Sequence, residues 1–131
     1  MRELTGHRVN PANDTLRIVV TDAPGAGGAN HRYEITGFDA TKNPSANSGV
    51  DGQIRTSILF QNGPIPDAGV NGLTQEVLLE IVADRLQSFQ AGPFANSYNA
   101  EALKHVLLAK QSLLDRTRER MGRGVEGTHK A

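Results

Sequence analysis

Three arginines near the end of the chain are spaced for anion binding. Arg116, Arg120 and Arg123 stand at positions i, i+4 and i+7, so a helix would present them as one stripe. Guanidinium groups in such a stripe can hold a phosphate through charge-assisted hydrogen bonds. Asp115 and Glu119 are interspersed among them. Taken alone, the pattern is therefore more typical of a solvated, salt-bridged face, and basic residues also suit a helix C-terminus.

Phe89 and Asn99 carry groups that could complete a nucleotide site. The chain has four Phe, two Tyr and no Trp, so each aromatic counts as a core anchor or a stacking platform. Taken singly, Phe89 is more typical of a core residue and Asn99 of a helix cap. A site needs the aromatic ring for a base, the amide for a ribose or base edge, and the arginines for phosphate.

The helix that would carry Phe89 is expected over residues 74–90. Asn71 or Thr74 can cap its start. At about 1.5 Å per residue it would be roughly 25 Å long. Gly92, in a left-handed conformation, and the proline after it would end the helix. Its expected packing stripe, widened by Leu79 and Ile81, consists of Leu78, Val82, Leu86 and Phe89.

A second helix, expected over residues 97–123, would carry Asn99 and the arginines. It begins near Ser97 or Asn99 and stops around Gly124. The last residues, 125–131, are expected to form a mobile tail. The apolar face of this second helix consists of Leu103, Val106, Leu107, Lys110 and Leu114, with Ala102, Ala109 and Leu113 on the flank.

The first half of the chain reads as a small antiparallel sheet. Strands are expected over 16–21, 31–39 and 54–61, with a fourth if the first dozen residues join. Loops rich in Gly, Asn and Ser, residues 23–30 and 41–53, would connect them. The predicted class is α+β, with a β-rich region over 1–66 and an antiparallel two-helix hairpin over 67–131.

The hairpin geometry constrains any shared site. Phe89 and Asn99 would lie at the turn, whereas Arg116 and Arg120 would lie roughly 25–30 Å away along the second helix. One chain cannot unite them, but an antiparallel dimer could. Two long helices also cannot cover their apolar faces alone in a chain that is 37% hydrophobic. We therefore expect a homo-oligomer in which hairpins pack together.

Composition narrows the function classes. Lys plus Arg equals Asp plus Glu at 14 each, whereas proteins that coat DNA or a membrane usually carry a basic excess. No apolar run approaches the roughly 20 residues of a membrane span. The absence of Cys excludes thiolate metal sites and favours a reducing cytoplasm, and the four His are far apart. We expect local recognition of a charged ligand, without DNA, membrane, metal or cofactor.

Catalytic patterns are weaker than the binding pattern. The glycine-rich run from Gly25 to Gly28 lacks the Lys-Ser/Thr of a phosphate loop and is more typical of a hairpin connection. No Ser or Thr stands in a local pattern with a His and an acid. A general acid–base enzyme stays open, because carboxylates from distant positions can meet in a fold.

Several longer motifs resemble the helical-hairpin domain of bacteriophage anti-defence proteins. Two families share this domain: the anti-CBASS sponges, which sequester cyclic oligonucleotides, and the Thoeris anti-defence sponges, which add an N-terminal β-rich region. The β-rich first half favours the second family. The motifs that carry the resemblance lie at 58–65, 69–74, 84–95, 116–120 and 123–129.

The resemblance implies a function and a site. A Thoeris sponge binds a cyclic ADP-ribose isomer without cleaving it, in the host bacterial cytoplasm, and assembles as a homodimer that can extend to a hexamer. Its interface pocket uses a Phe, an Asn and two Arg, which fall here on Phe89, Asn99, Arg116 and Arg120. Separate sites for cyclic oligonucleotides would involve Arg123 or the turn at residues 61–63. A cyclic di- or trinucleotide sponge, a dual binder and a phage structural protein without ligand remain the alternatives.

Overall fold

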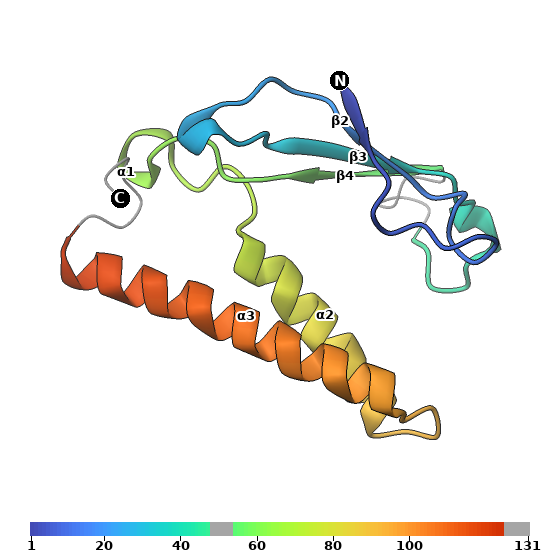
Figure 1. Cartoon of the computed structure of the whole chain (residues 1–131). Helices are drawn as coiled ribbons and strands as arrows, with labels where there is room; N and C mark the ends of the chain where they lie inside the picture. The colour runs from blue at the N-terminus through green and yellow to red at the C-terminus, as the bar shows by residue number, and fades with distance from the viewer. Residues whose placement is uncertain (48–53, 125–131) are drawn as a thin grey trace. The chain divides into compact units, whose positions relative to one another are not determined.

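The computed structural model describes residues 1–47 and 54–124 and has the α+β class that the sequence predicts (Figure 1). The chain divides into two compact units, Met1–Asn62 and Gly63–Ala131. The first unit holds the strands and the second holds the helical hairpin. The predicted tail and part of the predicted second loop lie outside the described residues. The division into separate domains at residue 66 stays a prediction.

An antiparallel sheet of four strands, in the order β1-β2-β3-β4, organises the described part of the first unit. Each strand pairs with its neighbour in sequence, which short connections allow for antiparallel strands. The expected sheet is confirmed, and the first dozen residues do supply a fourth strand. The strands are β1 (Arg2–Leu4), β2 (Arg17–Val20), β3 (Arg32–Thr36) and β4 (Arg55–Leu59), with short 3-10 helices η1 (Ala26–Gly28) and η2 (Ala40–Lys42) in the connections.

One face of the sheet is apolar because side chains alternate along each strand. Tyr33 pairs with Val20 on one side and with Ile58 on the other, so the three share a face. Val20 is only 1% exposed. Phe60 meets Tyr33 edge to face, with ring centroids 5.7 Å apart. The strand expected over residues 31–39 is present from Arg32 to Thr36, with Tyr33 and Ile35 on this apolar face.

The opposite face of the sheet is charged. Glu3 accepts hydrogen bonds from Arg8 at 2.8 Å and from Arg17 at 2.5 Å. The bond from Arg17 is the main reason that the pKa of Glu3 lies below its usual value. Glu34, on the same face, lies 3.4 Å from Arg55. Exposed ion pairs of this kind contribute little to the stability of a fold.

The glycine-rich loop after β2 is a hairpin connection, as the sequence predicts, and Asp22 fixes it. The Asp22 carboxylate accepts hydrogen bonds from the backbone N–H groups of His31 and Arg32, which open β3. Gly25 lies against the buried His31 ring, because a Cβ at Gly25 would be 3.0 Å from the ring carbon Cε1. The loop therefore uses its glycine for close packing rather than for a phosphate.

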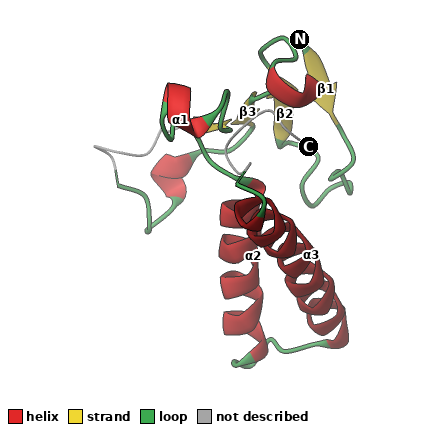
Figure 2. Ribbon diagram, turned by 90° about the vertical axis from the view of Figure 1, so that its left-hand side faces the viewer, coloured by secondary structure: helices red, strands yellow, loops and turns green. Residues whose placement is uncertain are grey.

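The described residues of the second unit form three helices (Figure 2): α1 (Ile65–Ala68), α2 (Gln75–Gln90) and α3 (Ser97–Gly122). The predicted helices correspond to α2 and α3, and Thr74 caps α2 by accepting a hydrogen bond from the Val77 N–H at 3.4 Å. The sequence did not predict the short helix α1, which follows Pro64 and contains Pro66. Proline is nevertheless tolerated in a first helical turn, and Pro66 stands there.

The contact between α2 and α3 differs from the predicted stripe on α2. Ala83 is 1% exposed and lies at its centre, with Leu79 and Leu86 half-buried on either side. Val82 and Phe89, which were expected in the stripe, are 43% and 39% exposed. The small Ala83 side chain allows close approach there, so the seam rotates toward it. The predicted apolar face of α3 is confirmed, with all five of its residues half-buried.

Candidate ligand-binding site

The turn between α2 and α3 is held by reciprocal hydrogen bonds between Gln90 and Asn96. The Gln90 amide donates to the Asn96 carbonyl, and the Asn96 N–H donates to Gln90 Oε1, both at 3.1 Å. The Asn96 side chain also donates to the Phe94 carbonyl at 3.0 Å. Gly92 does not have the positive φ that we expected at the end of α2. These amide bonds and Pro93, rather than a left-handed glycine, define the turn.

Asn99 is not the cap of α3. The cap is Asn96, whose Oδ1 accepts a hydrogen bond from the Asn99 backbone N–H at 2.8 Å. The side-chain amide of Asn99 makes no hydrogen bond with any residue in the described part of the chain. Asn99 is half-buried in the first turn of α3. Its amide is therefore available for a ligand, which the capping interpretation did not allow.

Phe89 lies in the last turn of α2 and is not a core residue. It is 39% exposed, and the guanidinium carbon of Arg85 lies 5.4 Å from its ring centroid. Arg85 is one helical turn earlier, at the i, i+4 spacing that brings side chains together. An exposed aromatic ring beside a fixed turn is a suitable platform for base stacking.

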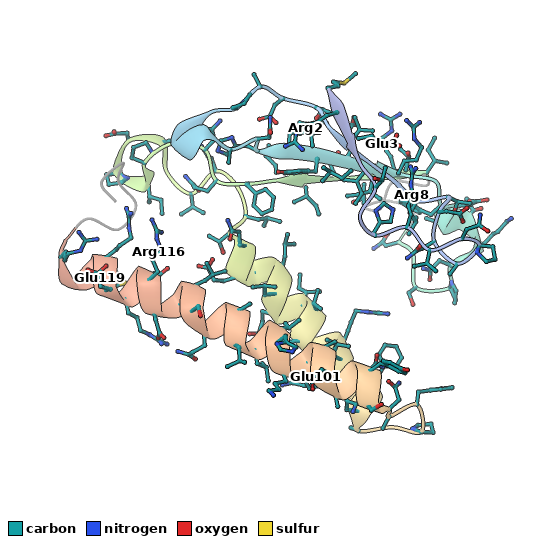
Figure 3. All side chains as sticks on the ribbon, viewed as in Figure 1. Arg2, Glu3, Arg8, Glu101, Arg116 and Glu119 are labelled. Atoms are coloured by element: carbon teal, nitrogen blue, oxygen red, sulfur yellow. The ribbon has the colours of Figure 1, made fainter. Side chains whose placement is uncertain are left out.

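Arg116 differs from its neighbours on α3 because they are paired and it is not. Asp115 lies 3.7 Å from Arg118, and Glu119 forms an ion pair with Arg123 at 2.5 Å. Arg116 is exposed and makes no hydrogen bond or ion pair with any described residue. Figure 3 shows its side chain extending away from the helix near Glu119. The salt-bridged interpretation of the stripe therefore fits Arg123 and does not fit Arg116.

The other two arginines of the stripe differ from Arg116. Arg120 is only 5% exposed. Arg123 follows the last residue of α3 and bonds to Glu119. Burial holds a guanidinium in a fixed position, whereas an exposed one samples many rotamers. The stripe therefore combines one exposed cation, one buried cation and one ion-paired cation.

No single hairpin brings the four candidate residues together. Asn99 and Arg116 are on the same continuous helix, α3, where their separation corresponds to about 25 Å along the axis. Phe89 and Asn99 flank the turn at one end of the hairpin, and the arginines lie toward the other end. One chain thus presents two half-sites, one with an aromatic ring and an amide and one with guanidinium groups.

The outer side of α2 carries an exposed apolar surface that we call the α2 outer face, formed by Val77, Ile81, Val82 and Phe89. Their exposed fractions are 42%, 54%, 43% and 39%. Helical periodicity puts these residues on one side, away from Ala83. Contiguous apolar surface of this kind usually marks a contact with another molecule.

In the part of the chain that the structure describes, no group of three His, Cys, Asp or Glu residues could hold a metal ion. Glu101 and His105, which stand at i and i+4 on α3, form a hydrogen-bonded pair at 2.9 Å. In the same part of the chain, no helix is long and apolar enough to cross a membrane.

Known proteins share this hairpin. Residues 52–106 match the family described as "Acb2/Tad1, hairpin domain". The hairpin of this chain is thus similar to the Acb2/Tad1 hairpin domain over those residues. It is also 44% identical over 73 residues to a Bacillus phage SBSphiJ7 protein named Thoeris anti-defense 1. That match covers 56% of this chain and 51% of the phage protein.

These two similarities support the resemblance to phage anti-defence proteins that the sequence motifs indicate. The chain spans about half the length of the curated relative that it matches. The matched domain contains Phe89 and Asn99 and ends before Arg116 and Arg120. Because α3 continues unbroken to Gly122, all four residues nevertheless belong to one hairpin.

Sequence reasoning missed three residues that shape the turn end of this hairpin. Asn96 and Gln90 build the turn, and Arg85 contacts Phe89. The signals were present in part. Asn96 directly precedes the expected helix start at Ser97, and asparagine is a preferred residue for an N-cap. Arg85 precedes Phe89 by one helical turn. The choice between Asn96 and Asn99 as the cap depends on backbone geometry that spacing alone does not give.

Proposed function

We propose that this chain is a phage anti-defence sponge that counters the bacterial Thoeris system inside the host cell. It binds a cyclic ADP-ribose-type signal and withholds it, without cleavage, from the host effector. The similarity to a phage protein named Thoeris anti-defense 1 supports the biological role. The observation that supports ligand binding is Arg116, an exposed guanidinium that has no polar partner among residues 1–47 and 54–124, whereas its neighbours Asp115 and Glu119 form ion pairs.

Each candidate residue has a role that suits its group. The Phe89 ring stacks on adenine, and the unused Asn99 amide bonds to the ribose or to a base edge. Arg116 and Arg120 hold the pyrophosphate, each through charge-assisted bonds of about 1.5–3 kcal/mol. The burial of Arg120 suits this role because a fixed guanidinium loses little entropy when it binds.

The site is shared between two copies of the chain in this proposal. Two hairpins packed antiparallel through the α2 outer face place Phe89 and Asn99 of one copy beside Arg116 and Arg120 of the other. A two-fold dimer then contains two identical sites. The exposure of Val82 and Ile81 supports this packing, because a stable interface would cover such apolar side chains. Further assembly to a hexamer is compatible with this arrangement.

Sequestration places a thermodynamic demand on the site. A sponge competes at equilibrium, so its affinity and its concentration must exceed those of the effector. Pre-organisation of the pocket raises affinity without any turnover. The reciprocal Gln90–Asn96 bonds supply this rigidity at the turn, next to the two residues proposed to hold the nucleoside.

The proposal is tested by ligand retention and recovery. The purified protein is incubated with cyclic ADP-ribose isomers and, separately, with cyclic di- and trinucleotides, and the complex is separated from free ligand. Heat denaturation then releases the bound molecule for chromatography. We expect an unaltered cyclic ADP-ribose isomer to be recovered. Recovery of cyclic oligonucleotides alone would indicate a CBASS sponge, a degraded product would indicate an enzyme, and no retention of any ligand would indicate a structural protein.

A further inference from the structure

Arg85 is an exposed arginine whose one contact in the described part of the chain is an aromatic ring. Its guanidinium carbon lies 5.4 Å from the Phe89 centroid. It makes no hydrogen bond or ion pair with a described residue. Arg118 and Arg123, two other exposed arginines of the hairpin, each have a carboxylate partner. The contact between Arg85 and Phe89 lies within α2, so it does not depend on any other part of the molecule.

The ring that Arg85 contacts is the proposed stacking platform, which puts a cation at the edge of the bound base. An exposed cation–π contact favours the arginine conformation that lies on the ring over other conformations by only about two- to fivefold. A charge-assisted bond to phosphate is much stronger, by about ten- to a hundredfold in binding. A nucleotide phosphate within reach would therefore draw the guanidinium away from the ring.

The surroundings of Arg85 strengthen this argument. Ile81 precedes it by one helical turn and Phe89 follows by one turn, so Arg85 lies within the α2 outer face. The apolar neighbours Ile81 and Val82 are 54% and 43% exposed. If a second copy covers the α2 outer face, the Arg85 cation in its middle loses contact with water and needs a negative partner. A bound phosphate supplies that charge.

We propose that Arg85 is a third phosphate-binding arginine, which rests on Phe89 in the empty site and turns to the ligand phosphate when a base stacks on that ring. This inference rests on the proposed function and extends it. Arg85 belongs to the same half-site as Phe89 and Asn99, whereas Arg116 and Arg120 come from the other copy. The ligand is accordingly a nucleotide with at least two phosphates, which three guanidinium groups can share.

The first test measures affinity for cyclic ADP-ribose by calorimetry. Arg85→Gln is compared with Arg85→Lys and with Lys104→Gln, which removes one exposed charge from α3. We expect about tenfold weaker binding for Arg85→Gln, a partial loss for Arg85→Lys, and wild-type affinity for Lys104→Gln. A purely structural Arg–Phe contact would change the melting temperature and leave the affinity unchanged.

The second test assigns Arg85 to its half-site. Arg85→Gln is co-expressed with the double variant Arg116→Ala/Arg120→Ala, so that mixed dimers form. One site of each mixed dimer then has all its residues, and we expect binding to exceed that of either variant alone. Co-expression of Arg85→Gln with Phe89→Ala restores no site, because both changes fall in the same half.

The outcomes separate this inference from the proposed function. If wild-type protein binds cyclic ADP-ribose and Arg85→Gln binds it equally well, Arg85 is not a ligand contact and the function stands. If co-expression of Arg85→Gln with Phe89→Ala restores ligand binding as well as co-expression with Arg116→Ala/Arg120→Ala does, the half-site assignment is wrong. If the wild-type protein retains no nucleotide, the function fails and takes this inference with it.

Discussion

Asn96 and Asn99 share one hydrogen bond but have different roles. Asn96 Oδ1 accepts a hydrogen bond from the Asn99 backbone N–H at 2.8 Å, whereas the Asn99 side chain bonds to no residue in the described part of the chain. Asn96 also bonds through its backbone to Gln90. The structure therefore assigns stability to Asn96 and makes the Asn99 amide available for ligand. Two residues of one type, three positions apart, provide a matched pair for mutation.

The first prediction separates these roles. Asn96→Ala removes the cap and a bond of the turn, so we expect a loss of about 1 kcal/mol in unfolding free energy and a melting temperature lower by a few degrees. Asn99→Ala should leave the melting temperature within about one degree and weaken cyclic ADP-ribose binding about tenfold. Thermal unfolding and calorimetry measure both. The assignment fails if Asn99→Ala destabilises the protein and Asn96→Ala does not.

The second prediction concerns Arg116 and its neighbour Arg118. Arg116→Ala removes an exposed cation that pairs with no described residue, and we expect ligand affinity to fall about ten- to a hundredfold while the oligomer stays intact. Arg118→Ala breaks a pair with Asp115 at 3.7 Å and should change affinity less than about twofold. Equal losses in the two variants would point to a general charge effect instead of a specific contact.

The third prediction concerns the acid sensitivity of the sheet unit. Backbone hydrogen bonds, from Arg32 first and His31 next, hold the pKa of Asp22 below its usual 3.8, against the opposing effect of desolvation. A lowered folded-state pKa stabilises the fold at neutral pH, and this contribution is lost as the pH falls below 3.8 through the folded-state pKa. The melting temperature of Asp22→Asn should therefore lie below that of the wild type at pH 7, and the difference between the two melting temperatures should narrow toward pH 3.

The control for Asp22→Asn is Asp84→Asn, an exposed carboxylate on α2. It removes the same charge without touching the loop that Asp22 fixes. A melting difference for Asp22→Asn that stays constant from pH 7 to pH 3 would mean that the stabilisation does not come from the ionised carboxylate.

The fourth prediction concerns the α2 outer face. Val82→Glu puts a charge on a surface that we expect another copy to cover, and desolvation of that charge should weaken the dimer more than about tenfold. Gln87→Glu introduces the same charge at an exposed polar position of the same helix and should leave the dimer affinity unchanged. Sedimentation or light scattering at several protein concentrations reports the mass. A wild-type monomer, or a Val82→Glu protein with unchanged mass, would contradict the proposed packing.

The helix boundaries could be predicted because local chemistry decides them. The Thr74 hydroxyl caps α2, and residues around Gly122 end α3. The seam on α2 could not be predicted in the same way. Leu78, Leu79, Val82 and Leu86 give a broad apolar arc, and only the packing shows that the small Ala83 lies at its centre.

The candidate site shows a similar division. Spacing identified the arginine stripe, and its helical placement is confirmed. Spacing did not show that Asp115 and Glu119 pair with other arginines, or that Arg120 is buried while Arg116 is exposed. Rotamers and burial decide these features, and they depend on the folded neighbours rather than on sequence period.

The central claim is that two copies of the chain share each site, and mixed dimers test it most directly. Phe89→Ala and the double variant Arg116→Ala/Arg120→Ala are co-expressed with different tags, and the doubly tagged dimer is purified. Neither parent protein should bind cyclic ADP-ribose, whereas the mixed dimer should bind with near wild-type affinity at about one of its two symmetric sites. A mixed dimer that binds no better than its parents would contradict the shared site.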